Sequence, residues 1–371
     1  ATGYLGIHIL EKLLENEEGK VYILIRKEPG MTIEQKLLNK MHYYFGTKYD
    51  KYLGNKIVIF QGDITKDGFG LQQKELFELG NEVTTIINSA AKVSHYGNYI
   101  EFYNTNVKSV DKLIDFANIF KCKIYHVSTL SISGNALVDQ YYMEQKFKEE
   151  VEFLENSFYI GQDLENVYVK TKFEAERKML EAIKNGTDGY ILRMGNLMPR
   201  LSDGKFQDNI GDNAYINRLK ALMKIGAIPK YLMNGYLEFT PIDSCSEAII
   251  KIIEHTSKQN KIYHLFNDNH VTVQRFLKTV QDLGTNIEVI DNEQFKEKLK
   301  KLIRNANSEI LNTLINDMDK DLNLHYESNV KLNSKHTKKL LELYGFKWPE
   351  IDKKYIENIL KLVKGETNDS K

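Results

Sequence analysis

The chain has 371 residues, 42% of them hydrophobic, which suffices for a large buried core and exceeds one ordinary domain. Basic and acidic residues are balanced at 51 each, which argues against a nucleic-acid-binding protein with a broadly basic surface. No apolar stretch approaches the ~20 residues of a membrane helix and nothing resembles a signal peptide, so we expect a soluble cytoplasmic protein.

The chain opens with Ala1-Thr-Gly-Tyr-Leu-Gly6, and apolar residues then recur at helical spacing over 7–16. A glycine turn that leads into a helix N-terminus offers free N–H groups to a pyrophosphate. The strand that should precede such a turn is missing before Ala1. We therefore expect a piece of a longer chain.

The next predicted strand, 21–26, ends in Arg26, where an acidic residue would hydrogen-bond the ribose hydroxyls of NAD. The planar guanidinium matches phosphate oxygens instead, and Lys36 on the following helix adds a second charge. This pattern predicts a 2′-phosphate and hence NADPH rather than NADH. The alternative is a solvated arginine at a strand end.

Four further apolar strands are predicted, at 56–63, 84–90, 123–129 and 189–196. Continuous apolar strands separated by helical segments indicate a parallel sheet covered on both faces. Ligands bind beyond the carboxyl ends of such strands, where Asp63, Ala90, Ala91 and Thr129 fall. We expect Asp63 to accept from the adenine amino group, the alanines to permit close approach, and Thr129 to bond the substrate oxygen. Each residue has an alternative role in a turn or in packing.

Tyr168 and Lys172 lie in a stretch of helix formers that runs to Asn185-Gly186, where a left-handed cap can end it. The two residues share a helix face. An ammonium near a phenol lowers a pKa that starts near ~10, which favours proton transfer to a carbonyl oxygen at neutral pH. The alternative is a surface tyrosine above a solvated lysine, because this spacing is common by chance.

Beyond Asn196 the alternation of strands and helices breaks. The amphipathic segment 213–228 is expected in the substrate cleft, and 237–267 returns to the sheet. We predict an α/β protein: a Rossmann-type doubly wound parallel sheet over 1–196, completed by 236–267. A smaller, mostly helical C-terminal substrate subdomain takes 197–235 and 268–371.

The stretch 292–317 is strongly helical and basic on part of its surface. Its cations are Lys296, Lys298, Lys300, Lys301 and Arg304. We consider it a candidate docking surface for an acidic partner domain, although most such runs are solvated faces. Cys122 and Cys245 are too few for a disulfide framework or a zinc cluster, so we predict no metal site and expect Cys122 in the core.

These motifs resemble the extended short-chain dehydrogenase/reductases. The segments that carry this resemblance are Ala1–Gly6, Leu24–Arg26, Gly62–Ile64, Ser89–Val93, Asn104–Val107, Val127–Gly134, Tyr168–Glu176 and Arg193–Asn196. Three others resemble the terminal thioester reductase domains of nonribosomal peptide synthetases and carboxylic acid reductases in particular: Asn217–Pro229, Leu237–Asp243 and Tyr263–Asn267. The resemblance covers most of the chain.

The resemblance implies a catalytic set of Thr129, Tyr168 and Lys172. Thr129 is preferred over Ser128 and Ser131 because it stands five residues before Gly134. The implied cofactor-binding residues are Gly3, Tyr4, Leu5, Gly6, Arg26, Lys36, Asp63, Ile64, Ser89, Ala90, Ala91, Asn106, Val127, Tyr168, Lys172, Met194, Gly195 and Asn196. The chain departs from many relatives at Asn88, where they have histidine, and at Lys36, where they have arginine.

The implied activity is the NADPH-dependent reductive release, as an aldehyde, of an acyl or peptidyl thioester held on the phosphopantetheine arm of a carrier domain. A second NADPH could carry the aldehyde to an alcohol. Tyr168 would donate the proton, Thr129 would hold the oxygen, and Lys172 would lower the phenol pKa and bind the nicotinamide ribose. One alternative is an extended reductase or epimerase acting on a free metabolite such as a nucleotide sugar. Another is a non-catalytic NADP-sensing module, which would usually lack the Tyr/Lys pair.

Overall fold

The computed structural model describes residues 1–15, 19–93, 97–134, 151–164, 166–256, 258–305, 314, 318, 324 and 330–365. The α-helices are α1 (Tyr4–Glu15), α2 (Ile33–Phe45), α3 (Gln73–Glu82), α4 (Tyr99–Phe102), α5 (Ser109–Phe120), α7 (Val167–Lys184), α8 (Ala214–Ile225), α9 (Ile242–His255), α10 (Val273–Asp282), α11 (Asn292–Asn305), α13 (Lys335–Leu343) and α14 (Lys353–Lys364). The strands are β1 (Val21–Ile25), β2 (Ile57–Gln61), β3 (Thr85–Asn88), β4 (Lys123–Thr129), β5 (Val151–Phe153), β6 (Gly189–Met194), β7 (Leu197–Met198), β8 (Ala227–Pro229), β9 (Tyr236–Leu237), β10 (Thr240–Pro241), β11 (Ile262–Leu265), β12 (Val271–Thr272), β13 (Glu288–Ile290) and β14 (Val330–Leu332).

The predicted parallel sheet is confirmed. Four parallel strands run in the order β11-β6-β4-β3, and β1 pairs with β2 in a second parallel ladder. All six residues of β6 are buried, as expected for a strand covered on both faces. The carboxyl ends of β4 and β6 lie at one edge, because Thr129 is opposite Met194.

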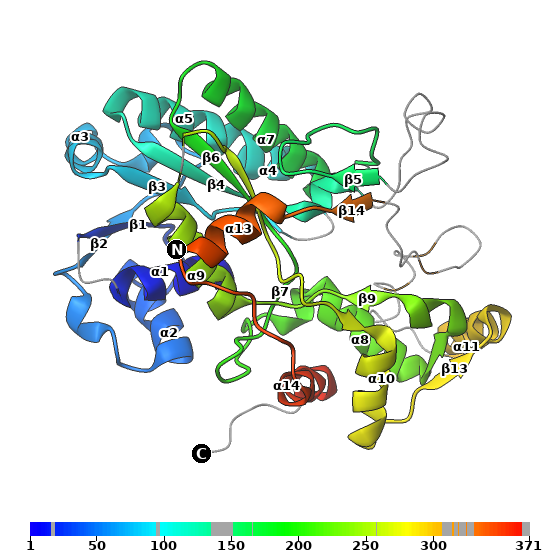
Figure 1. Cartoon of the computed structure of the whole chain (residues 1–371). Helices are drawn as coiled ribbons and strands as arrows, with labels where there is room; N and C mark the ends of the chain where they lie inside the picture. The colour runs from blue at the N-terminus through cyan, green and yellow to red at the C-terminus, as the bar shows by residue number, and fades with distance from the viewer. Residues whose placement is uncertain are drawn as a thin grey trace.

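Helices cover both faces of the sheet (Figure 1). Side chains alternate along each strand, so Tyr190 and Leu192 of β6 pack in a core with α1 and α9, while Ile191 packs in a core with α5 and α7. Leu341 of α13 and the buried Trp348 join the first of these cores. The sheet is thus the middle layer of three.

A separate apolar cluster lies beside the sheet and is built mainly from α8, α10 and α14 (Figure 1). Helix α8 corresponds to the predicted amphipathic segment 213–228. The Asn213 side chain caps its first turn by accepting from Ile216 N, and Gly226 ends it with a φ of 66°. The buried face of α8 supplies Ile216 and Leu219 to the cluster.

A buried ion pair fixes α7 against the sheet. Arg193 of β6 and Glu176 of α7 are both 0% exposed, with 2.8 Å between Nη2 and Oε2. The guanidinium also donates to the backbone oxygens of Glu155 and Ser157, and it lies over the ring of Phe153. The position of α7 therefore depends on a pairing that would be costly to break.

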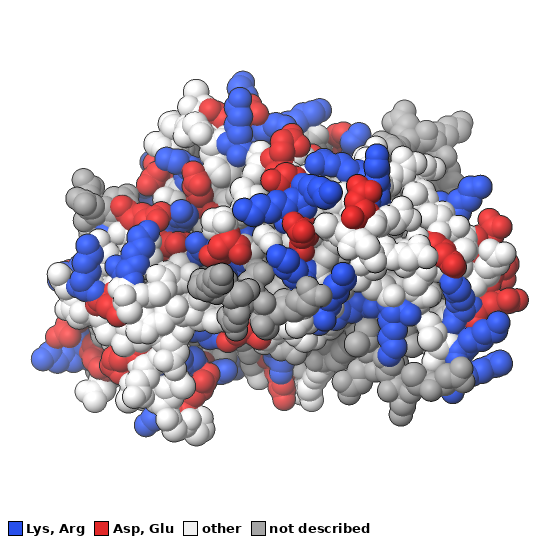
Figure 2. All heavy atoms as spheres, turned by 90° about the horizontal axis from the view of Figure 1, so that it is seen from below, with Lys and Arg blue, Asp and Glu red and all other residues white. Residues whose placement is uncertain are grey.

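The surface carries charges of both signs. On the face seen from below, basic and acidic side chains are interspersed (Figure 2), in keeping with the balanced composition. Within the described ranges, no helix combines the length and the apolar character needed to cross a bilayer.

Candidate active site

The glycine turn forms the first wall of the site. Helix α1 starts at Tyr4, directly after Gly3, and a side chain added at Gly3 would meet no atom within 4 Å. At Gly6 an added Cβ would lie 3.1 Å from Ser89 Oγ and 3.0 Å from Ala1 Cα, so this glycine permits close contact between α1 and the end of β3. The uncrowded position at Gly3 and the helix N-terminus that directly follows it suit a pyrophosphate.

Tyr4 and Leu5, both predicted cofactor residues, turn their side chains into the interior. Tyr4 Oη donates to Met198 O at 2.9 Å, and its ring packs edge-on against Phe206. Leu5 is buried in the core with α9. Any contact of these two residues with a phosphate would therefore come from their backbone.

A large polar pocket extends from the end of β1 to the segment after β3. Its volume is about 670 Å³, and Arg26 and Ala91, two predicted cofactor residues, line it together with Thr65, Lys92 and Lys108. Three of its lining residues are cations, and Glu101 is the acidic one, paired with Lys92. A pocket with three cations suits an anionic ligand such as the phosphates of a dinucleotide.

Two other predicted residues of this region already have partners. The Lys36 ammonium pairs with Glu28 and also donates to Arg26 O at 3.2 Å. Asp63 Oδ1 accepts from Thr65 N and Thr65 Oγ1, at 2.9 and 2.7 Å. Burial alone would raise the pKa of Asp63, but its two hydrogen bonds with Thr65 and the nearby Arg26 hold that pKa below its ordinary value.

Asn106 connects the segment that lines the pocket to helix α7. It lies in a π-helix, η3 (Tyr103–Lys108), and π-helical turns occur often at functional sites. Its side chain accepts from Lys92 N at 2.7 Å and donates to Lys92 O and to Thr171 Oγ1, each at 3.1 Å. Asn106 therefore fixes the backbone after Ala91 relative to α7.

Thr129 and Tyr168 meet at the carboxyl end of β4. Thr129 is buried and donates from Oγ1 to Ser131 Oγ at 3.1 Å, and Tyr168 is half-buried in the first turn of α7 with its phenol near the Thr129 hydroxyl. Asn166 caps α7 by accepting from Tyr168 N at 2.9 Å. Burial raises the pKa of Tyr168 to about 12, and the nearby Thr129 hydroxyl opposes part of this rise. The prediction of a lowered phenol pKa is wrong, since the phenol stays protonated well beyond neutral pH.

Lys172 is held by the sheet rather than directed at the phenol, which explains why the phenol pKa is not lowered. Its Nζ donates to Val127 O at 2.6 Å and lies 3.3 Å from His126 Nε2. Because an ammonium can only donate, His126 accepts through Nε2. Its Nδ1 lies 3.1 Å from the Asn88 amide. Burial lowers the pKa of Lys172 to about 8, with Glu176 acting in the opposite direction.

The predicted residues Met194, Gly195 and Asn196 lie at the end of β6. Glu238 Oε2 accepts from Asn196 N at 2.7 Å, and Oε1 accepts from Thr240 Oγ1. A Cβ at Gly195 would lie 2.8 Å from the Glu238 carboxylate and 2.6 Å from Phe266 Cβ, so no side chain fits there. Burial raises the pKa of Glu238 to about 7, against its hydrogen bonds with Thr240 and Asn196.

The structure thus brings the predicted residues together as two connected groups. Arg26 and Ala91 line the polar pocket, while Thr129, Tyr168, Lys172 and Val127 gather at the end of β4. No role was predicted for four residues that matter here: His126, Glu238, Lys92 and Lys108. Only His126 left a sequence signal, as a polar residue inside an otherwise apolar strand.

The amino-acid sequence matches the NAD-binding family described as male sterility protein over residues 1–249. L-2-aminoadipate reductase of Saccharomyces cerevisiae is 25% identical over 323 residues, which cover 83% of this chain and 22% of that protein. The chain spans less than a third of the length of the first curated relatives that it matches.

Two solved structures share the fold over nearly the whole chain. The thiolation-reductase di-domain of an archaeal non-ribosomal peptide synthetase has a TM-score of 0.83 and 30% identity, covering 98% of this chain and 74% of that one. The terminal R domain of the myxalamid pathway has a TM-score of 0.81 and 22% identity, covering 100% and 90%. The chain belongs to the NAD-binding family of male sterility proteins, within the extended short-chain dehydrogenase/reductases, and is a relative of terminal reductase domains.

Proposed function

We propose that this protein reduces a carrier-bound acyl or peptidyl thioester and releases it as an aldehyde, using NADPH. The observation that carries the proposal is the proximity of the Thr129 and Tyr168 hydroxyls at the carboxyl end of β4, together with the buried ammonium of Lys172 on the same helix as Tyr168. The kinship with synthetase reductase domains supports the thioester as substrate. A cytoplasmic location belongs to the same proposal.

In the proposed reaction Thr129 and Tyr168 bind the carbonyl oxygen of the thioester. When bound, the reduced nicotinamide supplies the hydride that the carbonyl carbon accepts. Tyr168, protonated at neutral pH because burial raises its pKa to about 12, donates its proton to the developing oxyanion. The resulting thiohemiacetal then loses the phosphopantetheine thiol as its carbon–sulfur bond breaks, which leaves the aldehyde. Whether a second reduction to the alcohol follows depends on how fast the aldehyde leaves.

Lys172 and the end of β6 would position the reactants. Val127 O and His126 hold two of the three donors of the Lys172 ammonium, and the proposal assigns the third to the nicotinamide ribose. Gly195, where no side chain fits, and Asn196 would border the nicotinamide.

The preference for NADPH rests on the cations of the polar pocket. Arg26, Lys92 and Lys108 all line it, and a guanidinium binds phosphate oxygens in a bidentate way. We expect Arg26→Ala to raise the KM for NADPH about tenfold or more while leaving the KM for NADH nearly unchanged, because only NADPH carries the 2′-phosphate. The neighbouring exposed Lys27→Ala is the control. Equal losses with both cofactors would contradict the assignment.

A carrier domain is the proposed partner, and α11 is its candidate docking surface. Lys296 and Lys298 are paired with Glu293 and Glu288, at 3.1 and 2.6 Å. The exposed cations of this helix are Lys300, Lys301 and Arg304. Residues 306–313 and 315–317 of the predicted basic stretch lie outside the described residues. The proposal therefore rests on these three exposed cations, which suit an acidic partner.

The decisive experiment follows NADPH oxidation with acyl-loaded carrier domains and identifies the product by mass spectrometry. We expect Tyr168→Phe to lower turnover by a factor on the order of 10² to 10⁴ with little change in NADPH affinity, because general acid catalysis contributes about that much. Tyr344→Phe, at an exposed tyrosine outside the site, is the matched control. Full activity of Tyr168→Phe, or turnover of free nucleotide sugars instead of thioesters, would refute the proposal.

A further inference from the structure

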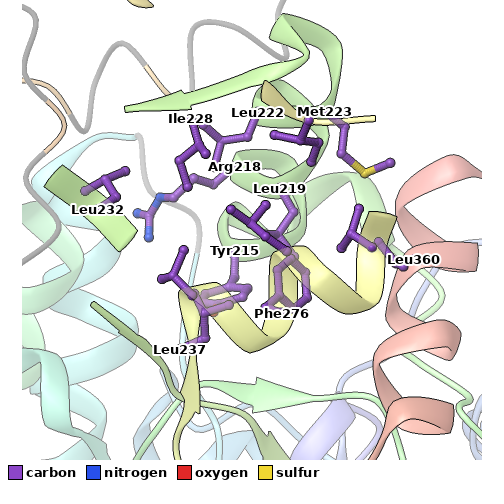
Figure 3. Close-up of a pocket in the computed structure, with 14 residues that line it drawn as sticks. Tyr215, Arg218, Leu219, Leu222, Met223, Ile228, Leu232, Leu237, Phe276 and Leu360 are labelled. Atoms are coloured by element: carbon purple, nitrogen blue, oxygen red, sulfur yellow. The ribbon is translucent and has the colours of Figure 1, made fainter. Parts of the chain in front are cut away.

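Two cavities of the structure have opposite linings. One, of about 50 Å³, lies among α8, α10 and α14, and Figure 3 shows Leu219 and Phe276 converging on it with other apolar side chains. The other is the polar pocket of about 670 Å³, lined by Arg26, Lys92 and Lys108. Phosphate groups are strongly hydrated anions that bind cations rather than hydrocarbon, so a phosphorylated ligand belongs in the polar pocket.

Lys36, predicted as the second cation for a 2′-phosphate, lies beside the polar pocket. Its Nζ donates to the backbone oxygen of Arg26 at 3.2 Å, and the Arg26 side chain lines that pocket. The Lys36 side chain is only 14% exposed, so its ammonium is fixed next to the strand end instead of moving freely in water. The two cations are therefore neighbours, as a shared phosphate site requires.

An anion of the protein already faces this ammonium. The carboxylate of Glu28 forms a hydrogen-bonded ion pair with Lys36 Nζ, and the Glu28 side chain is 51% exposed. Carboxylates and phosphates accept from the same donors. A phosphate that reaches Lys36 must therefore either displace Glu28 into the adjoining water or lie next to its negative charge, and both cost free energy.

The backbone between β1 and α2 holds Glu28 in this position. Glu28 forms an antiparallel bridge with Met31, across a turn in which Gly30 has a φ of 78°. Thr32 then starts α2 with a capping box, and Lys36 N donates to Thr32 O at 3.0 Å in the first turn of that helix. The turn and the helix start thus fix both members of the ion pair relative to the end of β1.

We propose that Glu28 competes with the 2′-phosphate of NADPH for Lys36 and thereby limits the preference of the protein for the phosphorylated cofactor. This inference rests on the proposed function and adds a specificity-determining residue to it. Arg26 binds the arriving phosphate, Lys36 exchanges Glu28 for it, and the half-exposed carboxylate turns into water. NADH carries no group that requires Lys36, so the competition leaves its affinity unchanged.

The test measures binding without turnover. Calorimetry at low ionic strength compares adenosine 2′,5′-bisphosphate, which carries the 2′-phosphate, with adenosine 5′-monophosphate, which lacks it. We expect Glu28→Gln to tighten the bisphosphate by about three- to fivefold, because a half-exposed ion pair is worth about that much, and to leave the monophosphate unchanged. The gain should shrink as salt is added.

Glu34→Gln is the matched control. Glu34 is an exposed glutamate in the first turn of α2, so its substitution changes the net charge of the protein equally. It should leave the ratio of the two affinities as in the wild type. Because each ratio is taken within one variant, a loss of folded protein does not affect it.

A second background makes the test specific to the ion pair. In Lys36→Met the carboxylate has no ammonium to withhold from the phosphate, so Glu28→Gln should gain less there than in the wild-type chain. An equal gain in both backgrounds would show general repulsion by Glu28 and would overturn competition for Lys36.

The two nucleotides also separate this inference from the proposed function. If both bind and their ratio is unchanged in Glu28→Gln, the competition is overturned and the proposed function stands. Weaker binding of the monophosphate in Glu28→Gln would overturn it as well, because Glu28 would then hold the ribose hydroxyls. If neither nucleotide binds the wild type, the proposed use of NADPH falls and the inference falls with it.

Discussion

Replacing Glu238 by glutamine should change how the stability of the protein depends on pH. Burial raises the pKa of this carboxyl from its ordinary value of 4.5 to about 7 in the folded protein. Below pH 4.5 the group is protonated in both the folded and the unfolded chain. As pH rises from 4.5 to 7, the unfolded chain ionises first, so the contribution of Glu238 to the stability of the fold is progressively lost.

The pKa difference sets the size of the effect. A change from 4.5 to about 7 corresponds to about 3 kcal/mol in the free energy of unfolding. Between pH 4 and pH 8 the wild type should therefore lose about 3 kcal/mol more than Glu238→Gln, with most of the difference developing below pH 7. The free energy of unfolding of Glu238→Gln should also differ from that of the wild type by a constant amount at every pH. The cause is that an amide cannot accept hydrogen bonds through both of its end atoms, as the carboxylate does from Asn196 and Thr240.

Urea unfolding at a series of pH values measures this difference. Trp348 is the single tryptophan and is buried against Phe346, so its fluorescence reports loss of the core between α9 and the sheet. Glu342→Gln, at an exposed glutamate of α13, serves as the control and should follow the wild type. A wild-type-minus-variant difference that stays flat from pH 4 to pH 8, or grows in the opposite direction, would show that Glu238 ionises normally in the folded protein.

Two further predictions concern the partners of α7. Arg193→Met should lower the free energy of unfolding, measured in urea, by about 3 to 5 kcal/mol, because it leaves the Glu176 carboxylate buried without its partner. The double variant Arg193→Met with Glu176→Gln should regain much of that loss. A single variant as stable as the wild type would contradict the role given to this pair. In His126→Phe, Lys172 loses an acceptor that favours its charged form, so the alkaline limb of the pH–rate profile should move below the wild-type value near pH 8. His126→Gln retains an acceptor, so its profile should stay closer to that of the wild type. Identical profiles for the two His126 variants would exclude a positioning role.

Most of the sheet was predictable because its strands are apolar along their whole length. The predicted strand 123–129 is β4 with the same limits, and the predicted return to the sheet over 237–267 contains β11. Helix α7 was predictable as well, since Asn166 caps its start and Asn185 follows its end. In both cases the signal is local, so neighbouring residues suffice to read it.

The geometry of the site depended on contacts between segments far apart in the sequence. The Tyr168–Lys172 spacing predicted a shared helix face, but it could not show that Val127 O and His126 draw the ammonium towards the sheet. The role of Asn106 depends on a π-helical turn, whose period differs from the pattern used to predict helices. The carboxyl of Glu238 next to Asn196 likewise depends on how the segment after β9 folds back onto the end of β6.

Adjacent residues at the end of β9 serve opposite environments, and this limits how the protein can change. Leu237 is fixed opposite Val271 of β12, while Glu238 contacts the backbone of Asn196. Inserting or deleting one residue here would exchange the two positions, which would place a carboxylate in the apolar cluster of α8, α10 and α14 and a hydrocarbon against the polar edge of the sheet. Related sequences should therefore differ in this region by substitutions at constant length, while insertions and deletions accumulate elsewhere.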